Sequence, residues 1–190
     1  MKKRIVIADD EPITRMDLRE ILEATGYNVV GEASDGFDAV ALCRKHSPDL
    51  VLMDIKMPLL DGLNAAKIIL NENLASGIVL LTAYSGKEFV EKATKVGVMG
   101  YIVKPIDEKS LIPTLEVAIS KSAEIKKIKK DIEKACSKLE ERKIIEKAKG
   151  LLMQRDEIIE QVAYDKIRTL SMNKRCSMGD IAEVIIMSYD

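Results

Sequence analysis

The chain has 190 residues, of which 47% are hydrophobic and 32% are charged, and its formal net charge is −1. This length suits one large or two small globular domains with a buried core. No stretch approaches the roughly 20 apolar residues of a membrane-spanning helix, and too few apolar residues follow the basic start MKKR to form a signal peptide. We therefore expect no contact with a membrane.

The three cysteines, Cys43, Cys136 and Cys176, are far apart and lack CxxC spacing. They predict neither a disulfide framework nor a zinc site, and a reducing cytoplasm is the expected location. Charge is divided unevenly, because residues 1–120 carry 14 Lys and Arg against 18 Asp and Glu, whereas residues 121–190 carry 16 against 13. This asymmetry is consistent with two parts that have different roles.

The first 120 residues alternate short β-branched runs with longer amphipathic ones. Five runs predict strands, at residues 4–8, 27–31, 49–53, 77–81 and 99–103. Between them, four patterns predict helices, at residues 13–24, 37–45, 63–71 and 87–95. Strands that are apolar throughout and separated by helices indicate a parallel sheet covered on both faces. The predicted fold class is α/β, with a doubly wound five-stranded parallel sheet.

Polar residues follow four of these strands. Asp9 and Asp10 come after the first, Asp54 after the third, Thr82 after the fourth and Lys104 after the fifth. Open parallel sheets bind ligands at the carboxyl ends of their strands. Clustered carboxylates repel one another unless a cation joins them, and oxygen ligands favour Mg²⁺. A carboxylate beside Mg²⁺ and a lysine can attack a phosphoryl group, so we expect Asp54 to be an exposed nucleophile at the strand tip.

Each residue also has a simpler structural explanation. Asp9 and Asp10 could cap the following helix, and Asp54 could be a turn residue ahead of Pro58. Tyr101, in the fifth strand, could be an ordinary core aromatic. The occurrence of the whole set at strand ends favours a phosphoryl site over these alternatives.

An acidic pair and the motifs MDIKMPLLDG, LTA and YIVKP occur in order and in phase with the strands. With them, residues 3–120 resemble the receiver domain of two-component response regulators. The resemblance implies a flavodoxin-like fold, a bound Mg²⁺ and phosphorylation by a sensor histidine kinase. It makes Asp54 the phosphoacceptor, Thr82 and Tyr101 a switch pair, and Lys104 the contact to the phosphoryl group.

The same resemblance implies the metal ligands. Asp10, Asp54 and the backbone carbonyl of Lys56 would hold Mg²⁺, with Asp9 acting largely through water. It also implies a cis peptide bond before Pro105.

Beyond Pro105 the pattern changes to one long helical stretch. Its stripe has alternating spacings of four and three, the heptad pattern of a coiled coil, and consists of Leu111, Leu115, Ala118, Ser122, Ile125, Lys129, Ile132, Cys136 and Leu139. Because three members are not apolar aliphatic residues, we expect a two-stranded coil of modest stability. The alternative is a helix packed on its own domain, but no second apolar stripe is present, which favours a homodimer.

Residues 141–190 predict a small three-helix bundle, with helices at 141–154, 157–171 and 177–187. Ser177 and Asp180 resemble a capping pair at the start of the third helix. Outside the predicted core lies a basic set that could bind a polyanion or could be a solvated surface, formed by Arg142, Lys143, Lys147, Lys149, Arg168, Lys174 and Arg175.

Three segments, IIEKAKGLLM, AYDKIRTLSMNKR and DIAEVII, resemble the ANTAR output domain, the RNA-binding module of antitermination regulators. The resemblance covers residues 137–187. Carried over by position, the implied RNA-binding residues are Lys147, Lys149, Gly150, Arg168, Met172, Asn173, Lys174 and Arg175. Gly150 could instead be a bare packing contact between helices, and Met153 is expected in the core. The connection QRDEIIEQ lacks the glycine often found there, which leaves the angle between the first two helices open.

Together these features predict a phosphorylation-activated response regulator that dimerises and binds RNA hairpins in leader transcripts to prevent transcription termination. The expected domains are a receiver at residues 1–120, a coiled-coil linker helix at 121–136 and an ANTAR domain at 137–190. Wording such as LEERKIIEKAKG is similar to ethanolamine-utilisation antiterminators.

Two other functions were considered. A DNA-binding response regulator is the alternative, but its recognition helix would have to be the apolar and acidic DIAEVIIMSYD. An enzyme acting on phosphate esters would need a second general acid, and Lys56 stands at that position. We therefore expect no enzyme, with at most a slow autophosphatase activity.

Overall fold

The computed structural model describes residues 2–83 and 87–188. The chain divides into two compact units, residues 1–127 and residues 128–190. Among the residues described, no helix combines the length and the apolar content that crossing a bilayer requires.

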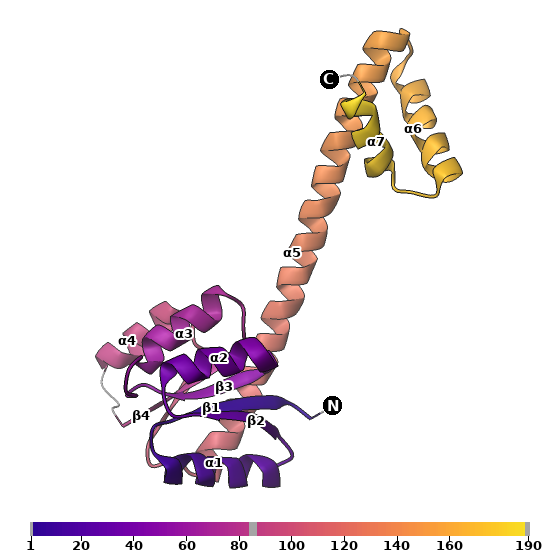
Figure 1. The fold of residues 1–190 in the computed structure, drawn as a ribbon. Helices are drawn as coiled ribbons and strands as arrows, with labels where there is room; N and C mark the ends of the chain where they lie inside the picture. Colours follow the sequence, from indigo (N-terminus) through magenta and orange to yellow (C-terminus); the bar gives the residue numbers. More distant parts are fainter. Residues whose placement is uncertain (1, 84–86, 189–190) are drawn as a thin grey trace. The chain divides into compact units, whose positions relative to one another are not determined.

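The first unit contains a five-stranded sheet, whose strands are β1 (Arg4–Ala8), β2 (Asn28–Ala33), β3 (Leu50–Asp54), β4 (Ile78–Thr82) and β5 (Gly100–Val103). All neighbouring strands are parallel, in the order β2-β1-β3-β4-β5 (Figure 1). All five predicted strands are present, and the doubly wound α/β fold class is confirmed. After β1 the chain adds strands first on one side and then on the other, and such reversals are where open sheets bind ligands.

The helices of this unit are α1 (Pro12–Ala24), α2 (Gly36–His46), α3 (Gly62–Asn71), α4 (Lys87–Val96) and the first part of α5, which begins at Glu108. Their starts follow local chemistry. Pro12 lies in the first turn of α1, where its missing N–H costs no hydrogen bond. Asp35 and Asp61 cap α2 and α3, each accepting a hydrogen bond from a backbone N–H in the first turn.

Helices cover both faces of the sheet (Figure 1). α2, α3 and α4 pack on one face, where Ala39, Ala65 and Ala93 join the core. α1 and the first turns of α5 pack on the other face, through residues such as Leu18 and Leu111. Every residue of β3 and β4 is buried. Polar residues at the ends of these strands are therefore held by a rigid support.

Helix α5 runs without a break from Glu108 to Asp156, a length of 49 residues. The predicted start of a separate helix at residue 141 is therefore wrong. The sequence EERK around that point consists of good helix formers and contains no Gly, Pro or capping residue, so nothing stops the helix there.

Residues 123–140 of α5 are exposed on all sides. Within them, Ile128, Ile132 and Leu139 are 50%, 57% and 60% exposed. With Ala135 they recur at spacings of four, three and four, which places them along one face of the helix. We call these four residues the α5 stripe. It includes Ile128, which the predicted heptad omitted in favour of Lys129, and it is apolar throughout.

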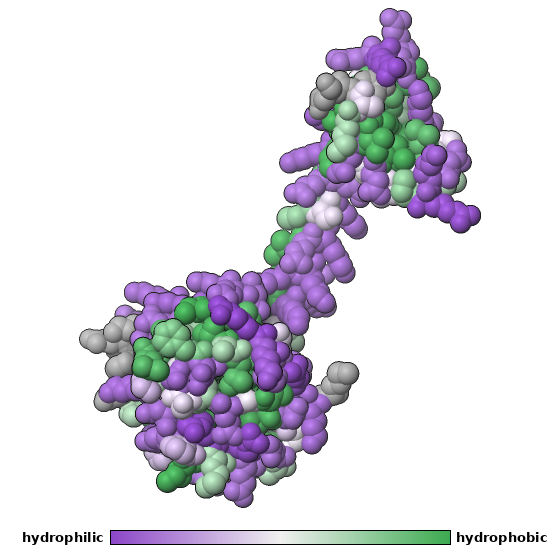
Figure 2. All heavy atoms as spheres, in the orientation of Figure 1, coloured by the Kyte–Doolittle hydropathy of each residue, from purple (hydrophilic) through white to green (hydrophobic). Residues whose placement is uncertain are grey.

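The second unit is a three-helix bundle made by the end of α5, α6 (Glu160–Lys174) and α7 (Met178–Met187). Each helix contributes two fully or nearly buried residues to its core, which consists of Ala148, Leu152, Ala163, Ile167, Ala182 and Ile185. Figure 2 shows apolar side chains of this bundle gathered between polar ones at its edges. The predicted capping pair is confirmed, because Ser177 and Asp180 form a reciprocal capping box at the start of α7.

Gly62, the first residue of α3, gives a test of this packing. A Cβ atom at this position would lie 2.0 Å from the backbone oxygen of Asp54. Gly62→Ala is therefore expected to lower the free energy of unfolding of the first unit by about 2–3 kcal/mol, measured by urea denaturation with circular dichroism. Lys67→Ala, on the exposed side of the same helix, is the control and should change it by less than about 0.5 kcal/mol. Equal midpoints for the two variants would contradict the contact.

Candidate functional site

The carboxyl edge of the sheet gathers the polar residues that follow its strands. Asp54 is the last residue of β3, and the strand register places it beside Leu81 of β4. Lys104 directly follows β5, and its peptide bond to Pro105 is cis, as the resemblance implies. These residues surround a cavity of about 250 Å³, which is lined by Asp10, Glu11, Asp54, Ile55, Lys56, Thr82, Ala83 and Lys104.

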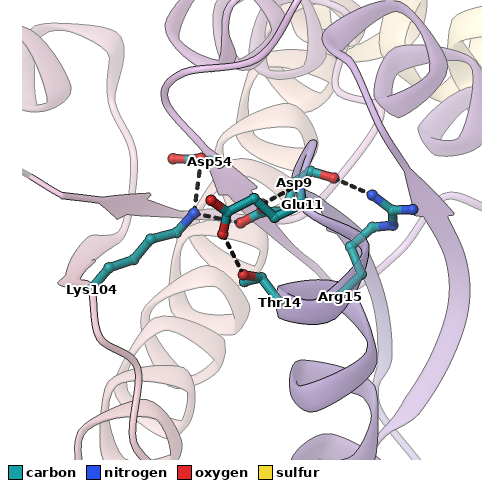
Figure 3. Close-up of polar contacts among 6 residues, drawn as sticks. All are labelled: Asp9, Glu11, Thr14, Arg15, Asp54 and Lys104. Atoms are coloured by element: carbon teal, nitrogen blue, oxygen red, sulfur yellow. Dashed lines mark hydrogen bonds and ion pairs between the residues drawn. The ribbon is translucent and has the colours of Figure 1, made fainter.

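The Lys104 ammonium bridges two carboxylates at this edge. Its Nζ lies 2.9 Å from Oδ2 of Asp54 and 2.8 Å from Oδ2 of Asp9 (Figure 3). Burial alone would lower the pKa of Lys104, but the hydrogen bonds with Asp9 and Asp54 outweigh it and raise the pKa above its usual value. The lysine therefore stays charged. Its single positive charge faces two carboxylates, those of Asp9 and Asp54.

Asp54 is more enclosed than the sequence suggested. We expected it to be exposed at the strand tip, but the residue is only 7% exposed. Two features explain the difference, since β3 lies at the centre of the sheet and the Lys104 side chain lies over the carboxylate. Asp54 reaches solvent through the cavity.

Asp9 is fully buried, and its environment is unfavourable for a charge. Burial raises the pKa of Asp9, although hydrogen bonds with Lys104 and with the backbone of Glu11 partly offset this effect. Its Oδ1 accepts a hydrogen bond from the Glu11 N–H at 3.0 Å. Among the described residues Oδ2 accepts no well-directed hydrogen bond. A buried carboxylate oxygen in this state is available to a further ligand.

The residues present fit a divalent cation. Asp9, Asp10 and Asp54 each offer a carboxylate oxygen, and the three oxygens lie within 4.8 Å of one another. Lys56 lines the same cavity, in the loop after β3. An all-oxygen donor set with excess negative charge is the kind of site that Mg²⁺ occupies. The capping alternative does not hold, because the N-cap residue of α1 is Glu11 and neither Asp9 nor Asp10.

Thr82 and Tyr101 lie on the same face of the sheet. Tyr101 of β5 pairs with Leu80 of β4, and side chains two residues apart on a strand share a face. Thr82 is 3% exposed, whereas Tyr101 is 43% exposed. The alternative that Tyr101 is an ordinary core residue therefore does not hold. Their role as a switch pair stays a prediction.

Arg15 supports the acidic pair, and the sequence analysis missed it. Its Nη1 donates a hydrogen bond of 2.6 Å to the backbone oxygen of Asp9 (Figure 3). Its Nε lies 3.6 Å from a carboxylate oxygen of Glu32. Nearby, the Thr14 hydroxyl donates to Glu11 at 2.8 Å. The position of Arg15, one turn into α1, is a signal that could have indicated this contact.

The predicted RNA-binding residues of the second unit fall into three groups. Lys147 and Gly150 are exposed on α5. A second exposed group lies toward and just beyond the end of α6 and consists of Arg168, Met172, Asn173, Lys174 and Arg175. Lys149 differs from both groups, because it is only 6% exposed.

Two expectations about α5 can be compared with the structure. A Cβ atom at Gly150 would meet no described atom within 4 Å, so the packing alternative for this glycine does not hold. Met153 is partly buried against the core of the bundle, as expected. Gly150 therefore leaves a bare, exposed segment of helix beside Lys147.

Lys149 is engaged inside the protein. Its Nζ lies 2.7 Å from Oε1 of Glu160 and 2.9 Å from Oε1 of Glu146. Hydrogen bonds to Glu160 and then to Glu146 raise the pKa of Lys149, and the Lys149 hydrogen bond lowers the pKa of Glu160. The predicted contact of Lys149 with RNA stays a prediction, but its charge already has two protein partners.

Comparison with known families identifies both units. The model of the response regulator receiver domain matches residues 5–116. The chain belongs to the response regulators. The ANTAR domain model matches residues 133–186, so this response regulator carries an ANTAR output domain.

One relative that matches nearly the whole chain and one that matches its receiver part agree with this assignment. The response regulator is 44% identical over 184 residues to the transcriptional regulatory protein PdtaR of Mycobacterium tuberculosis, a match covering 97% of this chain and 89% of the relative. It is 36% identical over 115 residues to the chemotaxis protein CheY of Thermotoga maritima, which covers 60% of this chain and 96% of CheY.

Solved structures match the receiver part of the response regulator. The signal receiver domain of the putative response regulator NarL from Mycobacterium tuberculosis superposes with a TM-score of 0.59 at 29% identity, covering 63% of this chain and 97% of the other. A LuxR-family response regulator from Aurantimonas has a TM-score of 0.59 at 34% identity, covering 63% and 86%.

The unfavourable burial of the Asp9 carboxylate gives a test of the site. The folded protein holds the Asp9 proton more tightly than the unfolded chain does, so its ionisation lowers stability as pH rises above the ordinary value of 3.8. Asp9→Asn should therefore raise the free energy of unfolding at neutral pH by about 1 kcal/mol in metal-free buffer. It should also remove the stabilisation by Mg²⁺ that the proposed metal site predicts for the parent.

Urea denaturation with EDTA or with Mg²⁺ measures both effects. Asp17→Asn removes a carboxylate from the exposed side of α1 and is the control, which should keep the Mg²⁺ response. An Asp9→Asn variant that is no more stable than the parent in EDTA would refute the destabilising role of Asp9.

Proposed function

We propose that this response regulator accepts a phosphoryl group on Asp54 from a sensor histidine kinase, dimerises, and binds RNA hairpins in leader transcripts to prevent transcription termination. The observation that carries the proposal is the convergence of Asp9, Asp10 and Asp54 around one lysine, in a chain that also contains an ANTAR domain. Because both proposed partners, the kinase's phosphodonor and nascent RNA, are inside the cell, we propose a cytoplasmic location.

The geometry suits attack by Asp54 on a phosphohistidine. A carboxylate oxygen of Asp54 forms the new P–O bond while the P–N bond of the donor breaks, and the electron pair leaves with the imidazole. Lys104 lies 2.9 Å from the nucleophile's Oδ2 and can offset charge on the transferred oxygens. Asp9, Asp10, Asp54 and the carbonyl of Lys56 would hold Mg²⁺, which supplies further charge neutralisation when bound.

Phosphorylation would control dimerisation and RNA binding through a shift between two conformations. The added charge at the carboxyl edge must bind one state of the first unit better than the other. Thr82 and Tyr101 are suited to transmit this conformational change, because their side chains share a face of the sheet. Thr82 is buried near the site, whereas Tyr101 is exposed to solvent. We propose that Tyr101 follows Thr82 when the phosphoryl group is present.

The α5 stripe is the proposed dimer contact. A helix that is exposed on all sides over residues 123–140 gains little stability from packing, and isolated helices of this length are marginal in water. Burial of Ile128, Ile132 and Leu139 against a second copy would remove apolar surface from water on both chains.

RNA is the proposed target of the second unit. The relative PdtaR is named as a transcriptional regulatory protein, and the exposed end of α6 carries two consecutive basic residues, Lys174 and Arg175. Tyr164 is 38% exposed and gives no broad stacking platform, so contacts with phosphates and loop bases would dominate. A link to ethanolamine utilisation stays a prediction.

DNA binding and enzymatic turnover are less well supported. α7 buries Ala182 and Ile185 and begins with an acidic cap, which is unlike a basic recognition helix. Lys56 stands two residues after Asp54, at the position where an enzyme acting on phosphate esters would need its second general acid. We propose that phosphoryl turnover is limited to slow autophosphatase activity.

The coupling can be tested by mass and oligomeric state. After treatment with acetyl phosphate and Mg²⁺, the parent is expected to gain one phosphoryl group and dimerise, whereas Asp54→Ala should do neither. Ile132→Lys should accept the phosphoryl group but stay monomeric, because it places a charge on the α5 stripe. Lys129→Ala, beside the stripe, is the control and should dimerise.

Mass spectrometry and analytical ultracentrifugation measure the two properties. Equal dimerisation of the parent and Asp54→Ala would refute the coupling, and dimers of Ile132→Lys would place the contact elsewhere.

RNA binding can be tested by gel shift with a two-hairpin leader RNA over a series of salt concentrations. Phosphorylated protein is expected to bind more tightly than unmodified protein. Lys147→Gln should weaken binding and reduce the salt slope by about 1, because one phosphate contact is lost. Lys134→Gln, on α5 before the bundle, should leave the slope unchanged. A steep slope without preference for hairpins would leave only nonspecific polyanion binding.

A further inference from the structure

The connection from α5 to α6 takes a sharp turn without glycine. Glu157 has a φ of 51°, in the left-handed region that side chains disfavour. α6 then begins at Glu160, and its N-cap residue, Ile159, provides no side-chain cap. The backbone of this connection does not by itself secure the direction in which α6 leaves α5.

Two ion pairs join α5 to α6 across this connection. Lys149 on α5 lies 2.7 Å from Glu160 at the start of α6. Asp156 at the end of α5 lies 2.6 Å from Lys166 on α6. The two lysines differ in burial, since the Lys149 side chain is 8% exposed and the Lys166 side chain is 51% exposed, whereas their partners Glu160 and Asp156 are 67% and 27% exposed.

The burial of Lys149 distinguishes it from a lysine that reaches for phosphate. Its neighbours along α5, Ala148 and Leu152, are in the core of the bundle. Its ammonium contacts carboxylates on both sides, Glu146 and Glu160. An RNA phosphate could be reached only by breaking these contacts, and would then compete with two negative groups. Lys147, two residues earlier, is exposed.

We propose that Lys149 is a positioning residue: it fixes the start of α6 against α5, and so places the exposed end of α6, residues 172–175, for RNA. The inference rests on the proposed RNA binding. It differs from the direct contact that the ANTAR resemblance implies for this lysine, because the contribution of Lys149 is made through Glu160 and not through a phosphate.

The two roles predict opposite results when Glu160 is changed. If Lys149 contacted RNA directly, Glu160→Gln would release the ammonium and remove a negative charge, and binding would tighten. If Lys149 positions α6, Glu160→Gln breaks the contact and weakens binding. The salt dependence of binding also separates the two roles, because its slope follows the number of neutralised phosphates. Loss of a direct contact would reduce the slope, whereas loss of a positioning contact would not.

The experiment measures the affinity of the full chain for two-hairpin leader RNA over a salt series, at a temperature where circular dichroism shows every variant folded. Lys149→Gln and Glu160→Gln are each expected to lower the affinity about tenfold at every salt concentration, with the salt slope of the parent. Lys149→Arg, which keeps the ion pairs, should restore most of the affinity.

Two controls complete the set. Lys147→Gln should reduce the slope by about 1, as a phosphate contact does. Glu183→Gln removes an exposed carboxylate from α7 and should not lower the affinity. If Lys149→Gln reduces the slope as Lys147→Gln does, or if Glu160→Gln tightens binding, the positioning role is overturned. If the parent does not bind the RNA, the proposed function fails instead.

Should Lys149→Gln prove unfolded, Glu160→Gln decides the question alone, since the Glu160 side chain is 67% exposed and its change leaves the core intact.

Discussion

A single ammonium holds together the carboxyl edge of the sheet. Lys104 lies within 3 Å of carboxylate oxygens of both Asp9 and Asp54, and the rest of the first unit is arranged so that this can occur. Buried strands carry the acids to a common edge, and the bridge limits a repulsion that would otherwise open it. The bridge does not balance the charge, because a third carboxylate, that of Asp10, lies within 4.8 Å of the two that contact the lysine. That deficit of positive charge is what makes the site receptive to a metal ion.

Two contacts also hold the backbone around the site in place. Gly62 brings the start of α3 against the carbonyl of Asp54, and Arg15 holds the carbonyl of Asp9 from the other side. Neither residue touches the position where chemistry is proposed. Both act on the main chain that carries the carboxylates, Gly62 by close packing and Arg15 through its guanidinium, and so restrict where the carboxylates can lie.

The sequence predicted the parts of this protein that follow from local pattern. Apolar runs identified all five strands, and the rule that ligands gather at strand ends located Asp54 and Lys104 before their contacts were known. Ser177 and Asp180 were identified because a capping box is a local interaction. Asp54, however, is buried by a side chain that lies 50 residues away in the chain, and no local pattern contains that information.

Three other features of the second unit have separate causes. α5 continues through residue 141 because helix formers continue there, and a change of domain need not coincide with a change of secondary structure. The sequence did not determine the angle between α5 and α6, because the connection lacks a glycine. In the structure, Glu157 adopts the left-handed conformation at this turn. Lys149 resembled other basic residues in the sequence. Glu146 lies three residues before it on the same helix, but the contact with Glu160 forms only once α6 is folded against α5.

The exposed stretch of α5 has a consequence for the lifetime of the protein. Residues 123–140 are exposed throughout, so packing against the other described residues does little to slow local opening, and they carry several lysines. Backbone amides there should exchange hydrogen faster than those of either core, and proteases that need an unwound segment should cut there first. Pairing with a second copy would shield the same bonds. A cell would then degrade the resting form sooner than the activated one, and signalling would shape abundance as well as activity.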